Sequence, residues 1–140
     1  MERTAPKTLR LERVFAIRLL QVGTLAALLS ASVNAIVLGV ASSFLGAVVI
    51  PPDETVTLGQ VVVASVAGSL GAAVAFAVID RFTRHPERIF WGAAAVGLLL
   101  SFAPIALAGA TGSSAGTLAL MHVVAAVTNV VLLTKLGQKG

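Results

Sequence analysis

The residues best suited to chemistry in this 140-residue chain are five polar side chains set in long apolar segments. They are Asn34, Gln60, Ser101, His122 and Asn129. Amide, hydroxyl and imidazole groups donate and accept hydrogen bonds, so a cluster of them can bind the polar part of a ligand. Between apolar helices the same groups can instead hydrogen-bond to one another and fix the register of the helices.

The composition excludes a water-soluble fold. Hydrophobic residues make up 57% of the chain and charged residues only 11%, whereas soluble domains carry about 25% charge. A membrane-spanning helix needs roughly 20 apolar residues, and the uncharged segments 19–52, 55–79 and 89–134 have room for four. The first of these is longer than the apolar region of a cleaved signal peptide, which favours an uncleaved span.

The spans follow from the gaps between charges and from local helix signals. We expect a membrane domain over residues 19–136, with spans at about 19–39, 57–79, 89–109 and 117–136. A basic segment, 1–18, precedes it and a short tail, 137–140, follows. Thr57 and Gln60 fit a capping box, Pro86 suits a first helical turn, and Ser114 suits an N-cap. Residues 40–52 are expected to extend the first helix and then run along the outer interface, with a re-entrant loop as the alternative.

Basic residues lie on one side only of this expected domain. All ten Lys and Arg residues precede the first span, follow the fourth, or lie between the second and third. The other two connections carry only Asp53 and Glu54. Cytoplasmic loops carry the Lys and Arg excess, so we expect both termini in the cytoplasm at a bacterial inner membrane. Nucleic acid is not an expected partner, because no aromatic platform accompanies the cations.

Catalytic and metal-binding groups are missing from the apolar segments. The chain has no cysteine, and its only other histidine, His85, is expected on the opposite side of the bilayer from His122. Zinc needs at least three protein ligands, and none cluster. Ser113 and Ser114 are near His122 in the sequence, but no acid and no G-x-S-x-G motif accompany them. We therefore expect no enzyme activity, no cofactor and no metal site.

Each span carries a face of small residues on which the polar residues also fall. The faces are Gly23, Ala27, Ser30, Ala31 and Asn34; Ala64, Gly68, Gly71, Ala72 and Ala75; Ala93, Gly97, Ser101, Pro104 and Ala108; and His122, Ala125, Ala126, Asn129 and Leu133. Helices in lipid associate through close packing of small residues. We therefore expect an all-α, antiparallel four-helix bundle with these faces packed inward. The alternative is that small residues fall on every face through composition alone.

The polar residues are expected in two layers across the bundle. At 1.5 Å per residue, Asn34, Gln60 and His122 lie at similar depths below the outer helix ends. A deeper layer holds Ser30, Ser69, Ser101 and Asn129. One interpretation is a pocket open to the outside that binds a polar headgroup, and the other is a set of interhelical hydrogen bonds. An ionisable residue such as His122 within a span favours a functional role.

Three segments carry a resemblance to a known family. They are Pro51–Pro52, Thr55–Val62 and Leu120–Ala126. Around them, over roughly residues 51–136, the chain resembles an uncharacterised family of short four-span bacterial membrane proteins. This resemblance implies a four-helix protein of the cytoplasmic membrane and supplies no activity.

The expected function is that of a non-enzymatic accessory or structural subunit in the lipid bilayer. Small-residue faces exceed what one compact bundle requires, which favours packing into a homo-oligomer or a larger membrane complex. The alternative is a protein that binds or transports a small ligand or a lipid through the polar layer around His122.

Overall fold

A computed structural model of the protein describes residues 7–110 and 112–137, with side chains from residue 13 onward. These residues form four helices and one short hairpin: α1 (Lys7–Phe44), β1 (Val49–Ile50), β2 (Glu54–Thr55), α2 (Leu58–Phe82), α3 (Pro86–Leu107) and α4 (Gly112–Leu136). All four helices are long and apolar enough to cross a membrane. The prediction of a helical membrane protein with four transmembrane helices is therefore confirmed.

The segment after the first predicted span is partly helical and partly extended. α1 continues to Phe44, and Gly46 follows with a φ of 91°, a left-handed conformation that glycine adopts without steric cost. The chain then forms the hairpin, in which β1 and β2 pair antiparallel with Val49 opposite Thr55. This is the expected helix extension followed by extended chain.

The predicted helix signals hold at α2 and α3 but not at α4. Thr57 Oγ1 accepts a hydrogen bond from the Gln60 N–H (3.3 Å), and Gln60 Oε1 accepts one from the Thr57 N–H (2.8 Å). This reciprocal pair confirms the capping box, and Pro86 occupies the first turn of α3. The N-cap predicted at Ser114 is wrong, because α4 already begins at Gly112. Ser114 Oγ instead accepts the N–H of Val49 in the hairpin (3.0 Å).

The turn between α3 and α4 lies against the hairpin. Its geometry is a Schellman motif, in which the Ala110 N–H donates to Ile105 O (3.2 Å) and the Gly109 N–H donates to Ala106 O (3.1 Å). Gly109 has a φ of 72°, and a Cβ built on it would lie 3.8 Å from Pro51 Cγ. The hairpin and this turn are therefore neighbours at one end of the bundle.

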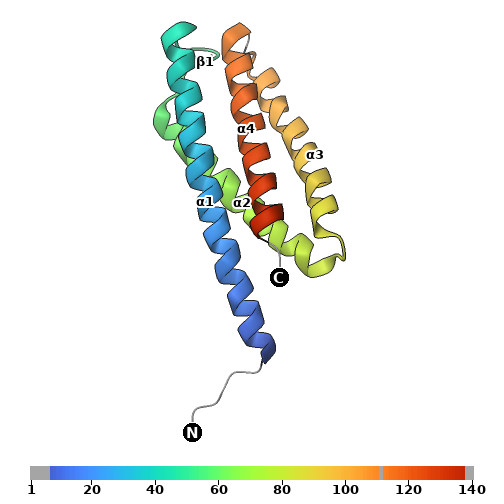
Figure 1. Ribbon diagram of the computed structural model, residues 1–140. Coiled ribbons are helices and arrows are strands. Elements are labelled where there is room, and N and C mark those ends of the chain that lie inside the picture. The colour runs from blue at the N-terminus through green and yellow to red at the C-terminus, as the bar shows by residue number, and fades with distance from the viewer. Residues whose placement is uncertain (1–6, 111, 138–140) are drawn as a thin grey trace.

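α1, α2 and α4 form the compact part of the bundle, and α3 lies at its edge. α1 packs against both α2 and α4, whereas α3 contacts α4 and, less extensively, α2 (Figure 1). The hairpin and the α3–α4 turn lie at one end, and the α2–α3 turn lies toward the other, as does the C-terminal end of α4 (Figure 1).

Charged residues of opposite sign lie at the two ends of the bundle. Asp53 and Glu54 lie at the hairpin, and Arg81, Arg84 and Arg88 lie around the α2–α3 turn.

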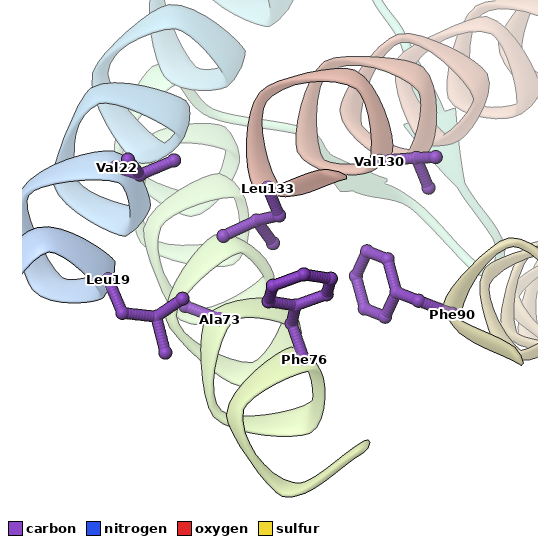
Figure 2. Close-up of a cluster of buried hydrophobic side chains, with 7 residues drawn as sticks. All are labelled: Leu19, Val22, Ala73, Phe76, Phe90, Val130 and Leu133. Carbon is purple, nitrogen blue, oxygen red and sulfur yellow. The ribbon is translucent and has the colours of Figure 1, made fainter. Parts of the chain in front are cut away.

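Two apolar clusters hold the helices together near the two ends of the bundle. The first takes residues from all four helices (Figure 2), namely Leu19, Val22, Ala73, Phe76, Phe90, Val130 and Leu133. Phe76 is completely buried, and its ring meets that of Phe90 edge to face with centroids 5.1 Å apart. The second cluster is Leu38, Ala41, Val48, Val61 and Met121. It contains no residue of α3, so α3 is anchored mainly through Phe90, its one buried residue among those described.

Small residues pack closely between α1 and α2 at Gly23, but other glycines of α2 and α3 have no close neighbour. A Cβ built on Gly23 would lie 3.0 Å from Ala73 Cβ, so α1 and α2 approach closely there. A Cβ built on Gly68, Gly71 or Gly97 meets no atom within 4 Å. The expectation that all four small-residue faces pack tightly is therefore wrong for α2 and α3, whose glycines face open space.

The close contact at Gly23 predicts that an added methyl group destabilises the bundle. In Gly23→Ala the new Cβ must displace Ala73, a side chain fixed to the α2 backbone, and overpacking of this kind costs about 1–3 kcal/mol. Gly39→Ala is the matched control, because it adds the same group to α1 in open space and gains up to about 1 kcal/mol of helix propensity. Reversible unfolding in bicelles measures both variants, and equal stabilities would contradict the close approach of α1 and α2.

The anchoring of α3 through Phe90 predicts a local effect of truncating that ring. Phe90→Ala removes the edge-to-face contact with Phe76 and should cost about 1–3 kcal/mol, less than in a soluble core because lipid also solvates apolar groups. Phe82→Ala is the control, since Phe82 is 77% exposed. Amide hydrogen exchange should accelerate in α3 for Phe90→Ala only. Unchanged protection of α3 would show that other contacts hold it.

Candidate functional site

A groove of about 680 Å³ lies between α2, α3 and α4. Its walls consist largely of the small residues Ala64, Gly68, Gly71, Ala72 and Ala75 from α2, Ala93, Ala94 and Gly97 from α3, and Ala125 and Ala126 from α4. Because α3 contacts α2 only lightly, these residues leave space between the helices and do not bring the backbones together. The faces predicted for helix packing are thus the walls of a cavity.

Larger side chains bound the groove at its two ends. Phe90 and Val130, both in the apolar cluster of Figure 2, line one end, and Ile50 and Val56 of the hairpin region line the other. No Asp, Glu, Lys or Arg residue is among its lining residues. The groove is therefore uncharged and mostly apolar, which suits a ligand with a large apolar part.

All five residues predicted for a ligand site line this groove. Asn34 reaches it from α1, Gln60 from the start of α2, Ser101 from α3, and His122 and Asn129 from α4. The hydrogen bonds of these five residues say more about their roles than the predicted division into an outer and a deeper layer. Gln60 and Ser101 form hydrogen bonds close to themselves in the sequence, whereas Asn34 and Asn129 each keep an amide oxygen that accepts no hydrogen bond, and His122 uses one ring nitrogen only.

His122 presents one ring nitrogen to a backbone carbonyl. Its Nδ1 lies 2.7 Å from Leu118 O, and because a carbonyl only accepts, Nδ1 carries the proton. In the neutral ring Nε2 is then a hydrogen-bond acceptor. The ring is half-buried and meets that of Phe102 at an angle of 61°, with centroids 6.5 Å apart. No three His, Cys, Asp or Glu side chains gather as a metal site within residues 7–110 and 112–137.

Asn129 leaves a buried oxygen without a partner. Its Nδ2 donates to Ala125 O at 2.7 Å, a contact that only the amide nitrogen can make, so the orientation of the amide is defined. Its Oδ1 is buried and accepts no hydrogen bond from any described residue, and the whole side chain is 6% exposed. An unpaired buried amide oxygen is costly, because hydrocarbon offers it no donor.

Asn34 joins α1 to α2 and also keeps an unpaired oxygen. Its Nδ2 donates to Ser65 Oγ at 3.1 Å, while its Oδ1 is buried and unpartnered within the part of the chain that the structure describes. Ser30 and Ser69, which were assigned to a deeper polar layer, are fully buried on α1 and α2 but do not line the groove. The sequence prediction therefore combined residues buried between α1 and α2 with residues that line the groove.

Gln60 and Ser101 line the groove but their polar groups are used locally. Gln60 Oε1 belongs to the capping box of α2, and Gln60 Nε2 donates to Glu54 Oε1 at 2.6 Å. Ser101 Oγ donates to Leu98 O at 2.6 Å within its own helix. For Gln60, the capping-box motif already pointed to this structural role, and the wider interpretation as a ligand-binding residue is not supported by its contacts.

The sequence analysis missed Ser65 and the role of the glycines. Ser65 is 5% exposed and partners Asn34, and its spacing of four residues from Ser69 would have placed both on one helix face. Gly68, Gly71 and Gly97 were interpreted as packing residues. Nothing in the sequence distinguishes a glycine that allows close approach from one that lines a cavity.

The family of unknown function DUF6069 matches residues 15–139, a stretch that also includes most of α1, which the sequence resemblance had left outside. No curated protein and no solved structure shows significant similarity to the chain. The match covers nearly the whole chain, and the protein therefore belongs to the family of unknown function DUF6069.

Proposed function

We propose that the protein is a non-enzymatic membrane protein that binds an amphipathic molecule in the groove between α2, α3 and α4. The observation that carries this proposal is the groove itself, which is mostly apolar, has no charged lining residue and includes the half-buried imidazole of His122 in its wall. The small apolar walls suit the apolar part of an amphipathic molecule, and the imidazole of His122 can hydrogen-bond with its polar part. The volume of about 680 Å³ falls within the range typical of small-molecule sites.

The orientation proposed for the bundle follows from its charges. The four helices run antiparallel, with both termini in the cytoplasm of a bacterium and the hairpin on the outer side of the cytoplasmic membrane. The arginines of the α2–α3 turn and Lys135 at the end of α4 support this orientation, as does the acidic hairpin at the opposite end. The groove then opens within the bilayer, where a lipid-like molecule can enter from the side.

A subunit that packs with itself or with a larger complex is the second candidate. It is favoured by the open space in front of Gly68, Gly71 and Gly97, because small-residue surfaces of this kind also receive a neighbouring transmembrane helix. In that case a helix of another chain fills the groove in place of a small molecule. The two candidates differ in what occupies the groove after gentle extraction.

Filling the groove is the direct test of the first candidate. Native mass spectrometry of the protein released from nanodiscs should show a monomer carrying a bound small molecule. Gly97→Leu places a large side chain in the groove and should remove most of this species, since the space in front of Gly97 is what the ligand occupies. Gly92→Leu is the matched control, because Gly92 also faces open space on α3 but does not line the groove.

Three outcomes of this measurement have distinct meanings. Loss of the bound molecule in Gly97→Leu alone supports binding in the groove. A wild-type protein released as a dimer or with another protein chain, and without a small molecule, supports the second candidate. A bare monomer, or equal loss in both variants, contradicts the proposal.

The proposed orientation predicts the activity of topology reporters. Alkaline phosphatase is active only outside the cytoplasm, so its insertion after Asp53 should give high activity and its fusion after Gly140 should give little. A green fluorescent protein, which fluoresces in the cytoplasm, should give the opposite pattern at the same two sites. The reverse result with both reporters would invert the orientation.

A further inference from the structure

We propose that the groove binds a long-chain carboxylic acid, and that the carboxyl group of this ligand shares its proton with Nε2 of His122. This inference rests on the proposed binding function and names the chemistry of the polar end of the ligand. It is carried by one accessible base in a groove that has no charged lining residue.

Nε2 of His122 is open to a molecule in the groove. Nδ1 lies 2.7 Å from Leu118 O and carries the ring proton, so Nε2 has a free lone pair. Nε2 has no partner among the described residues, and unlike the amide oxygens of Asn34 and Asn129 it is not buried. Because the ring lines the groove and Nδ1 is held against the α4 backbone, Nε2 is the nitrogen that a ligand meets.

His122 is the one titratable side chain in the lining of the groove. The ring that meets it from α3 is the uncharged Phe102, and the residues of α1 and α2 that line the groove carry no charge either. Glu54 accepts a hydrogen bond from the lining residue Gln60 (2.6 Å) but does not itself line the groove. A ligand that fits must therefore match one base and no other charge.

A carboxylic acid matches this site because it brings one proton to one base. The acid and the imidazole hold that proton between them, and the pair carries no net charge whether the oxygen or the nitrogen holds it. A neutral pair avoids the cost of an unpaired charge in apolar surroundings, which an ammonium group in this groove would incur. A hydrogen bond with an ionised partner is also stronger than one between neutral groups, which favours an acid over an alcohol.

The carboxyl group of the ligand lies toward the hairpin end of the groove. His122 follows Met121, which belongs to the same apolar cluster as Val48, the residue directly before β1. From this end the α2 wall extends from Gln60 to Ala75, a rise of about 22 Å along the helix. The apolar chain of the ligand lies along the alanine and glycine residues of this wall.

Three probes with the same chain length test this inference. Hexadecanoic acid brings an acidic proton, hexadecan-1-ol donates a weaker hydrogen bond, and methyl hexadecanoate has no donor. Competition with tritium-labelled hexadecanoic acid on the full-length protein in detergent measures the affinity of each. The acid should bind about tenfold more tightly than the ester, the effect of one charge-assisted hydrogen bond, and more tightly than the alcohol.

Variants then locate the selectivity. His122→Phe removes Nε2 but keeps an aromatic ring beside Phe102, and it should make the affinities for acid and ester about equal. His85→Phe is the matched control, because His85 is exposed before α3 and does not line the groove. Its preference for the acid should match that of the wild type. Because both variants are measured in the same detergent, the partition of each probe into micelles cancels in the comparison.

The shared proton has two further signatures. In the His85→Phe protein His122 is the only histidine, so the ¹⁵N resonance of its Nε2 can be followed directly, and it should shift with the acid but not with the ester. Binding of the acid should also weaken at alkaline pH, where both free partners have lost the proton that the pair holds. Binding of the ester should not change over the same range.

The outcomes separate this inference from the proposed function. Equal binding of acid and ester, or of acid and alcohol, by the wild type overturns selection of a carboxyl group, and this comparison decides the question even if His122→Phe does not fold. A preference that survives in His122→Phe overturns the assigned base. If no probe binds but a small molecule is retained on extraction, the inference fails and the proposed function stands. If no probe binds and the protein is released as a bare monomer, both fail.

Discussion

The amide oxygens of Asn129 and Asn34 are buried where hydrocarbon cannot donate a hydrogen bond, and this lack of donors governs the whole molecule. It requires the backbone to form helices, whose internal bonds satisfy every carbonyl between the ends. Hydrocarbon cannot accept a hydrogen bond either, which explains why Ser101 Oγ and His122 Nδ1 donate to backbone carbonyls one turn earlier in their own helices. Where a polar atom finds no such local partner, it needs one from a neighbouring helix or from a bound molecule.

Helix packing in this protein is uneven because lipid supplies no general hydrophobic drive. α1 and α2 approach closely at Gly23 and Ala73, and the hydrogen bond from Asn34 to Ser65 joins them again further along. α3 has only the contact through Phe90 as a buried anchor among the described residues. A helix held at one end by a large ring and bordered by glycine and alanine leaves space along the rest of its length. The groove is the consequence.

The same groove combines two properties that seldom coincide in a packed bundle. Its walls are apolar and uncharged, yet its α4 side includes the polar residues His122 and Asn129, whose side chains bond to backbone carbonyls of their own helix. Local helix geometry therefore sets the orientation of both side chains.

Sequence patterns are enough to predict the four apolar helices, the capping box at Thr57, the helix start at Pro86, and the placement of the five polar residues on small-residue faces. These features depend on local composition and on helical periodicity, which can be read along one chain. Three features follow only from the tertiary structure: Gln60 Nε2 bonds Glu54, Asn34 bonds Ser65, and Gly68, Gly71 and Gly97 line a cavity. Whether a small residue brings two helices together or leaves a gap depends on side chains distant in sequence, here above all on Phe76 and Phe90.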